Sequence, residues 1–199
     1  MTRFFLIRHG ATESSASIAG RTAGGKLAEA GREQAARLTH RLGQDRIAGF
    51  YSSPQQRARE TARALAEAAG REVRLAPELD EIDYGDWTGH MIDELQSLPL
   101  WREYNTIRSC TRIPHGEFML EVQARVVSFM ERLRQQHWKE SVALVSHADV
   151  IRAALVYYVG LPLDMMLRLE ISLASVSIID IENYGPLIRC INNTEPLCP

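Results

Sequence analysis

Two histidines in this sequence each follow a short apolar run that predicts a buried strand. His9 comes after the run at residues 4–7, directly behind Arg8, and His147 comes after the run at residues 142–145. A neutral imidazole can act as a nucleophile or as a general base, and a neighbouring arginine favours an anion such as phosphate. Either histidine alone is more often an ordinary surface or core residue, so the pattern matters only if the fold brings the two together.

A third polar cluster lies at the start of a predicted helix. Ser53, Pro54 and Gln56 predict a capping box. The helix that they open would run to about residue 68 and carry Arg57 in its first turn. The N–H groups of a helix N-terminus favour an anion, and a forked guanidinium there suits bidentate recognition of phosphate. The bland alternative is a solvated helix arginine.

A phosphate pocket built from these groups also needs an acid for the leaving group. The acidic segment LDEIDYGDW at residues 79–87 supplies four carboxylates, namely Asp80, Glu81, Asp83 and Asp86. Glu81 is the leading candidate, although composition alone does not choose among the four. The alternative is a solvated acidic loop with no catalytic role.

The elements that would position these groups alternate along the chain. Apolar patterning predicts strands at residues 4–7, 47–51, 73–75, 142–145, 172–181 and 187–191. It predicts helices at 28–42, 53–68, 117–136 and 149–159, with short helices in 91–104 that are broken at Pro99. Because each parallel crossover needs a helix, we expect an α/β fold, three-layer α/β/α with a mostly parallel central sheet. The last two strands are expected to be antiparallel. Ligands of such sheets gather at the carboxyl ends of strands, where all three clusters fall.

Composition limits the class of protein. The chain has 199 residues, of which 45% are hydrophobic and 24% charged, so residues 1–199 are expected to form a single globular domain. A net charge of -2 gives no reason to expect nucleic acid or an anionic membrane as a partner. The longest uncharged apolar run, at residues 153–163, is shorter than the ~18 residues of a membrane span, and no signal-like segment follows Met1.

The cysteines also bear on the compartment. Cys110, Cys190 and Cys198 are odd in number and show no CxxC spacing. This fits reduced thiols better than a disulfide framework or a zinc site, so we expect a cytoplasmic protein without a bound metal or cofactor. Its oligomeric state stays open, with a homodimer as one option.

Five stretches of the chain together resemble the histidine phosphatase superfamily, which includes the cofactor-dependent phosphoglycerate mutases. They are LIRHGAT at 6–12, LAEAGREQA at 27–35, YSSPQQRARETA at 51–62, LDEIDYGDWTG at 79–89 and VALVSHADVIR at 142–152. One such stretch would be weak evidence, whereas five in the same order are highly specific.

The resemblance implies roles for residues at the matching positions. It makes His9 the nucleophile, Glu81 the proton donor, and Arg8, Arg57 and His147 the phosphate clamp. Thr12, Ser15 and Ala148 complete the expected phosphate-binding set. Flanking arginines disfavour a charged imidazole and are expected to lower the pKa of His9.

The chain departs from the family pattern at four of these places. Relatives often carry Glu or Gln at the position of Ala11, Asn at Ser15, Gly at Ala148, and Ser at Phe118 in the segment Gly116-Glu117-Phe118. These departures concern contacts to the substrate rather than the core chemistry.

The expected function is that of a metal-independent phosphomonoesterase acting on a small phosphorylated metabolite through a phosphohistidine intermediate. Two alternatives stay open, a cofactor-dependent phosphoglycerate mutase and a catalytically lapsed phosphate-binding module. Mutases of this family usually carry a longer insertion after the catalytic glutamate, so the short chain and Ser15 favour the phosphatase.

Other motifs are weaker evidence for function. The segment GRTAGGK at 20–26 fits the start of a nucleotide-binding P-loop, but Leu27 replaces the required Ser or Thr and no strand is predicted before it. Segments 13–26 and 90–117 are expected to form a cap over the pocket. Within the second, Arg102, Arg108 and Arg112 either read a second anionic group of the substrate or form a solvated helix face.

Overall fold

A six-stranded sheet forms the centre of the computed structural model, which describes residues 1–13, 17–42 and 46–195. Its strands are β1 (Thr2–Arg8), β2 (Ile47–Ser52), β3 (Val73–Leu75), β4 (Ser141–Ser146), β5 (Val176–Glu182) and β6 (Gly185–Asn193). They lie in the order β3-β2-β4-β1-β5-β6. Strands β1–β4 are parallel to one another. Strand β5 pairs with β1 in the antiparallel direction, and β6 pairs with β5 in the antiparallel direction. The prediction of a mostly parallel sheet with a closing antiparallel pair is confirmed.

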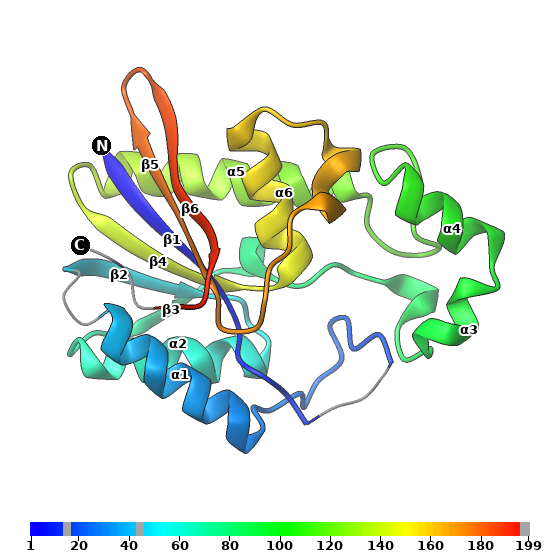
Figure 1. Cartoon of the computed structure of the whole chain (residues 1–199), viewed down its shortest axis with the longest axis horizontal. Coiled ribbons are helices and arrows are strands. Elements are labelled where there is room, and N and C mark those ends of the chain that lie inside the picture. Colours follow the sequence, from blue (N-terminus) through cyan, green and yellow to red (C-terminus); the bar gives the residue numbers. More distant parts are fainter. Residues whose placement is uncertain (14–16, 43–45, 196–199) are drawn as a thin grey trace.

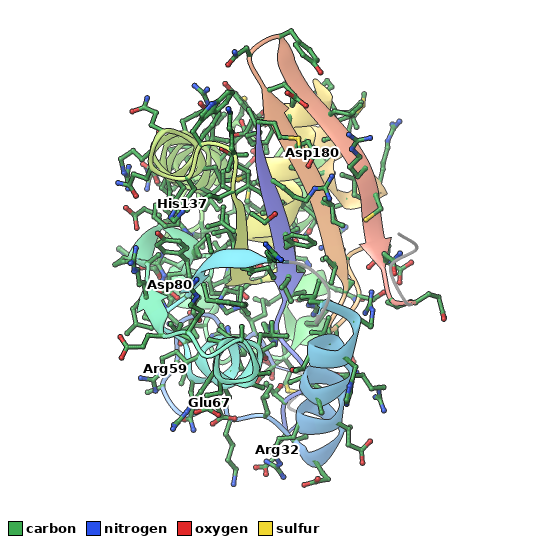
Figure 2. All side chains as sticks on the ribbon, turned by 90° about the vertical axis from the view of Figure 1, so that its left-hand side faces the viewer. Arg32, Arg59, Glu67, Asp80, His137 and Asp180 are labelled. Atoms are coloured by element: carbon green, nitrogen blue, oxygen red, sulfur yellow. The ribbon has the colours of Figure 1, made fainter. Side chains whose placement is uncertain are left out.

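Helices cover both faces of this sheet, as Figures 1 and 2 show. They are α1 (Glu29–Leu42) and α2 (Gln56–Ala68) on one face, and α5 (Met119–Gln136) and α6 (Ala148–Val159) on the other. Successive side chains of a strand point to opposite faces. In β1, Phe5 and Ile7 accordingly pack with α1 and α2, while Phe4 and Leu6 pack with α5 and α6. The expected three-layer α/β/α architecture is therefore present.

Two short helices lie together at one end of the molecule (Figure 1). They are α3 (Ile92–Gln96) and α4 (Pro99–Thr106), separated near Pro99 as the sequence predicts. Trp87 packs against Trp101 and Tyr104 of α4, with ring centroids 5.1 and 5.3 Å apart. Short 3-10 helices occur at Pro77–Leu79, Gly85–Trp87 and Leu163–Arg168.

The start of α2 differs from the prediction. The helix begins at Gln56, because Gln55 keeps an extended backbone with φ -65° and ψ 139°. The Ser53 hydroxyl accepts the Gln55 N–H at 3.2 Å, but the Gln56 side chain binds Glu60 at 2.7 Å instead of returning to Ser53. The predicted capping box is therefore wrong, and the Ser53 hydroxyl bonds to His147 instead.

Within the described ranges, no helix combines the length and the apolar character needed to cross a membrane. Cys110 is exposed and Cys190 is half-buried, and both are free thiols. Cys198 lies outside the described residues.

Candidate active site

Parallel strands of this sheet end at one edge, where a cavity of about 510 Å³ lies. Arg8 at the end of β1 pairs with Ser146 at the end of β4, and Ser52 of β2 pairs with Val145. The cavity is lined by side chains that follow these strands and by the segment after β1. The lining residues that the argument uses are Arg8, His9, Thr12, Arg57, Glu81 and Tyr84.

His9 is 93% buried and held in one tautomer. Its relative exposure is 7%, and its Nδ1 lies 2.8 Å from the carbonyl oxygen of Gly10. A carbonyl only accepts hydrogen bonds, so Nδ1 carries the proton and Nε2 keeps a lone pair. Burial, together with smaller effects of Arg57 and Arg8, lowers the pKa of His9 to about 3, against the opposing effect of the hydrogen bond to Gly10. The predicted direction is correct, but burial is the larger cause.

Helix α1 fixes the backbone that follows His9. The Ala11 N–H donates to Gln34 Oε1 at 2.8 Å, and the Ala11 carbonyl accepts the Ala28 N–H at 2.9 Å. A Cβ atom at Gly31 would lie 2.0 Å from the Ala11 carbonyl oxygen, so only glycine permits this approach. The LAEAGREQA stretch thus contributes to the site by holding the loop after the nucleophile.

Two arginines flank His9 inside the cavity. Arg57 is 4% exposed, lies in the first turn of α2, and donates to the Gly20 carbonyl at 3.0 Å. Arg8 donates from Nη1 to the Ile171 carbonyl at 2.6 Å, while its buried Nε has no hydrogen-bond partner within the described structure. A buried unpaired N–H is costly and marks a place where an anionic ligand would be stabilised.

Glu81 is the acid that reaches the cavity. Its Oε1 accepts the Ile82 N–H at 3.0 Å, and its Oε2 lies 3.5 Å from Arg57 Nη2. Burial raises the pKa of Glu81 to about 7, against the opposing effect of Arg57. A carboxyl group with this pKa holds a proton in a large share of molecules at neutral pH and can act as a general acid.

The other three acids of this segment have structural partners. Asp80 accepts from Gln55 Nε2 at 2.8 Å and from the Glu81 N–H at 2.8 Å. Asp83 accepts the Gly85 N–H at 3.0 Å, and Asp86 contacts His115 at the surface. Of the four candidates, Glu81 is the one that lines the cavity.

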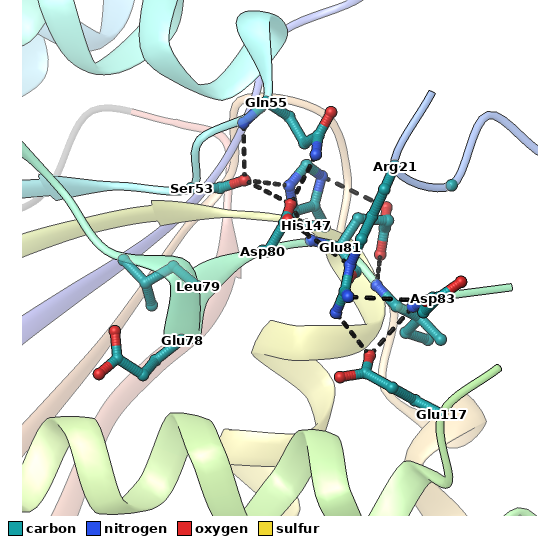
Figure 3. A network of polar contacts seen from close by, with 12 residues as sticks. Arg21, Ser53, Gln55, Glu78, Leu79, Asp80, Glu81, Asp83, Glu117 and His147 are labelled. Carbon is teal, nitrogen blue, oxygen red and sulfur yellow. Dashed lines mark hydrogen bonds and ion pairs between the residues drawn. The ribbon is translucent and has the colours of Figure 1, made fainter. Parts of the chain in front are cut away.

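His147 lies fully buried behind Glu81. Its Nε2 is 2.8 Å from Ser53 Oγ and its Nδ1 is 3.3 Å from Glu81 Oε2 (Figure 3). Its ring centroid is 5.1 Å from that of His9. Burial holds the pKa of His147 well below its usual value, and the neighbouring positive groups act in the same direction. The fold thus brings together the two histidines that the sequence separates by more than a hundred residues.

The remaining predicted phosphate ligands are placed differently. Thr12 lines the cavity and its backbone pairs with Leu27. Ala148 is the first residue of α6 and does not line the described part of the cavity. Ser15 lies outside the described residues.

The arginines of segment 90–117 do not line the described cavity and have partners within the protein. Arg108 is buried and pairs with Asp149 at 2.6 Å, while Arg112 pairs with Glu121 at 2.7 Å. Arg102 donates to the Ser97 carbonyl at 3.1 Å. Segment 20–26 does line the cavity through Gly20, Thr22 and their neighbours, but it follows no P-loop strand in the described part of the chain.

Sequence reasoning missed a group of residues that holds the Glu81 loop. Glu117 Oε2 accepts the Asp83 N–H at 3.0 Å and Arg21 Nη2 at 2.8 Å, and Arg125 donates to the Asp80 carbonyl at 2.8 Å. Figure 3 shows Arg21 reaching Asp83 and Glu117. The signal for this role in the sequence is Glu117 in the family-like segment Gly116-Glu117-Phe118.

The arrangement suits phosphoryl transfer. It combines a neutral imidazole with a lone pair, two guanidinium groups and an acid with a raised pKa. Among the described residues, no group of three or more His, Cys, Asp or Glu side chains is placed to hold a metal ion.

Comparison with known proteins agrees with this chemistry. Over 203 aligned positions, the chain is 32% identical to "Phosphoserine phosphatase 1" of Hydrogenobacter thermophilus, with 98% of this chain and 93% of that protein covered. It is 31% identical to "Probable phosphoglycerate mutase GpmB" of Photorhabdus laumondii, with 92% and 86% covered. The crystal structure of a putative alpha-ribazole-5'-P phosphatase from Escherichia coli superposes with a TM-score of 0.87 at 25% identity, covering 100% and 99% of the two chains. Residues 4–194 match the family described as the histidine phosphatase superfamily (branch 1). The chain therefore belongs to the histidine phosphatase superfamily.

Proposed function

We propose that this protein is a phosphomonoesterase that transfers the phosphoryl group of a small phosphorylated metabolite to His9 and then to water, with no metal ion taking part. The observation that carries this proposal is the buried His9 imidazole, whose Nε2 lone pair shares one cavity with two arginines and with Glu81. A phosphoric monoester hydrolase is also the class to which the named phosphatase relatives belong.

In the first step, Nε2 of His9 attacks phosphorus and the bond between phosphorus and the ester oxygen breaks. Glu81 gives its proton to the departing oxygen, so the product leaves as a neutral alcohol and Glu81 becomes a carboxylate. Arg8 and Arg57 neutralise the oxygens of the transferring group, where positioning and electrostatics supply most of the catalysis.

In the second step, the Glu81 carboxylate takes a proton from a water molecule while the water oxygen attacks phosphorus. The bond between Nε2 and phosphorus breaks, and inorganic phosphate leaves. Glu81 is protonated again and His9 returns to its neutral form, so the protein is ready for the next ester.

The phosphate clamp is proposed to consist of Arg8, Arg57 and His147, with Thr12 beside them. The buried unpaired Nε of Arg8 supports its part. His147 does not line the described cavity and its Nδ1 faces Glu81 Oε2 at 3.3 Å, so its place in the clamp is proposed on the family resemblance and on its ring lying 5.1 Å from that of His9. Ala148 would contribute its N–H at the start of α6. Ser15 is proposed on the family resemblance alone.

The charges around the cavity favour a phosphatase over a mutase. A mutase must hold a bisphosphate with an anionic group at both ends, which calls for cations on both sides of the site. Among the described lining residues, Arg8 and Arg57 are the cationic side chains, and both flank His9. Residues 14–16, which fall between lining residues, are Ser, Ser and Ala and bring no charge.

The proposed substrates are small phosphomonoesters such as phosphoserine, alpha-ribazole phosphate, sugar phosphates and phosphoglycerate. The first two come from the names of relatives. We further propose that residues 1–199 act as one catalytic domain capped by segments 13–26 and 90–117. We also propose that the protein acts in the cytoplasm, which the free thiols of Cys110 and Cys190 support.

The test is phosphate release from this panel of esters in the presence of EDTA, with wild-type protein and His9→Ala side by side. Release that survives EDTA and disappears in His9→Ala is the expected result. Release from wild type that persists in His9→Ala would overturn the mechanism. If no ester is hydrolysed but 2,3-bisphosphoglycerate primes the isomerisation of phosphoglycerate, the protein is a mutase; phosphate binding without either activity identifies a lapsed enzyme.

A further inference from the structure

Arg21 lies between the cavity and the loop that carries the proton donor. Its neighbours Gly20 and Thr22 line the cavity, whereas its guanidinium contacts the segment at residues 80–83. Nε donates to the Glu81 carbonyl at 2.8 Å, and Nη2 donates to Glu117 Oε2 at 2.8 Å. Figure 3 shows this side chain extending from its loop into the acidic network.

The same short segment is attached to the phosphate site. Arg57, which flanks His9, donates to the carbonyl of Gly20 at 3.0 Å. Gly20 and Arg21 are consecutive, so two residues connect an arginine of the proposed phosphate clamp to the backbone of Glu81. Gly20 has a φ of +48°, a left-handed conformation that glycine tolerates well and that sets the direction in which the chain leaves toward Arg21.

The carboxyl group of Glu81 depends on its backbone for its position. From the described residues it accepts one hydrogen bond, from the adjacent Ile82 N–H at 3.0 Å, and its contacts to Arg57 and His147 are longer, at 3.5 and 3.3 Å. The Glu81 carbonyl accepts Arg21 Nε at 2.8 Å and Arg125 Nη2 at 3.3 Å. Of the two hydrogen bonds that described residues donate to this carbonyl, Arg21 therefore makes the shorter.

Charge balance adds to this effect. Three carboxylates, Asp80, Asp83 and Glu117, lie within 4 Å of Arg21 at 3.5, 3.8 and 2.8 Å. Arg125 is the other arginine in contact with Glu117, at 3.3 Å. Without Arg21, the three like charges would face one cation across a partly buried loop, and their repulsion would move the backbone next to Glu81.

We propose that Arg21 is a positioning residue that holds Glu81 where it can protonate the leaving group, so that the segment forming the cavity wall also orients the general acid. This inference rests on the proposed phosphatase mechanism. It assigns Arg21 no contact with the phosphate and no part in the attack by His9.

Dependence on the leaving group tests this role. An alkyl phosphate needs a proton on its departing oxygen, whereas p-nitrophenyl phosphate releases a stabilised phenolate and does not. In Arg21→Ala, kcat/KM for an alkyl phosphate such as phosphoserine is expected to fall about 10- to 100-fold, as for other misplaced catalytic groups. The value for p-nitrophenyl phosphate should stay close to that of wild type. Because kcat/KM covers the steps up to formation of phosphohistidine, the later hydrolysis step does not enter the comparison.

Two further variants define the result. Arg21→Lys keeps the positive charge but places its donors on a single nitrogen, and should recover part of the loss on the alkyl ester. Arg63→Ala removes the same side chain from an exposed ion pair with Glu67 on α2 (Figure 2 labels Glu67), and should leave both esters unaffected. Thermal unfolding of Arg21→Ala establishes that the measured protein is folded.

An equal loss on both esters in folded Arg21→Ala, or no loss on either, would overturn the positioning role. The proposed function fails in a different way, which is the absence of His9-dependent hydrolysis of either ester by the wild-type protein. Failure of the positioning role is thus measured on Arg21→Ala, and failure of the proposed function is measured on the wild-type protein.

Discussion

The Nδ1 atom of His9 lies 2.8 Å from the carbonyl oxygen of Gly10, the residue that follows it in the chain. Because that carbonyl accepts a proton and cannot give one, the local backbone sets the tautomer of the ring. The other nitrogen, Nε2, is left with its lone pair. The nucleophile is therefore prepared by its own peptide segment, without a separate general base.

His9→Ala should abolish turnover, because His9 is the one imidazole among the described lining residues of the cavity and its Nε2 lone pair is the proposed nucleophile. Wild-type protein mixed with radiolabelled phosphomonoester and quenched in alkali should carry label on His9, since phosphohistidine survives alkali. His9→Ala should carry none. Arg63→Ala serves as the control for handling and should be labelled like wild type, and label in the His9→Ala protein would contradict the assignment.

Glu81 should set the alkaline side of the pH profile. Burial raises its pKa to about 7, and a general acid works only while protonated, so kcat/KM for an alkyl ester should fall as pH rises above about 7. Glu81→Gln should lose about 10²–10⁴-fold in kcat/KM and also lose this alkaline decline. The second ionisation of the substrate phosphate, near pH 6, affects both proteins alike. An unchanged alkaline decline in Glu81→Gln would assign it to another group.

The sequence predicted the order of the elements well and their ends less well. The apolar run at residues 4–7 marks β1, but the strand extends from Thr2 to Arg8 because Thr2 and Arg3 pair with β5 across the sheet. Such pairing depends on residues distant in the chain. The strand ends and the later start of α2 depend on contacts in the folded sheet. Local sequence patterns therefore do not predict them.

The candidate site, too, was predicted where local motifs define it and missed where contacts between distant residues define it. The spacing of strands and motifs placed His9 and His147 at one edge, and the structure brings their rings to 5.1 Å. The choice of Glu81 over Asp80 needed the family resemblance. Asp80 is excluded as the acid by its hydrogen bonds to Ser53 and Gln55, which are distant from it in the sequence. The network of Glu117 around that loop was missed for the same reason.

Glu81→Gln should make the protein more stable at alkaline pH although it lowers activity. The folded protein holds a proton on Glu81 up to a pKa of about 7, whereas the unfolded chain loses it near the usual value of 4.5. Between these values the folded state binds more protons, so this group makes the free energy of unfolding fall as pH rises. Glu81→Gln removes that dependence and should be more stable than wild type at about pH 8, by on the order of 1–3 kcal/mol.

Urea denaturation of both proteins at about pH 5 and pH 8 measures this difference. The stability gain of Glu81→Gln should shrink toward zero at the acidic end, where Glu81 is protonated in the folded protein and increasingly so in the unfolded chain. A gain of the same size at both pH values would mean that the variant acts through packing and not through the Glu81 proton.

Arg108 should matter for stability and not for reading a second anion of the substrate. Its Nη1 donates to Asp149 Oδ2 at 2.6 Å, and Asp149 is also bonded by Arg152 at 2.6 Å and Tyr84 at 3.3 Å. Burial alone would raise the pKa of Asp149, but Arg108 and Arg152 hold it below its usual value. Breaking a buried pair leaves a carboxylate short of compensation, so Arg108→Ala should lower the free energy of unfolding by about 3 kcal/mol.

Arg112→Ala is the matched control, because its pair with Glu121 is exposed on both sides and should change stability by less than about 1 kcal/mol. Steady-state kinetics with phosphoserine, 3-phosphoglycerate and glycerol phosphate complete the test. If Arg108 only ties the α4–α5 connection to α6, folded Arg108→Ala should change KM for all three esters by a similar factor. A rise in KM confined to the esters that carry a carboxylate would show that Arg108 reads that second anionic group after all, and the buried pair with Asp149 would then have to open when substrate binds.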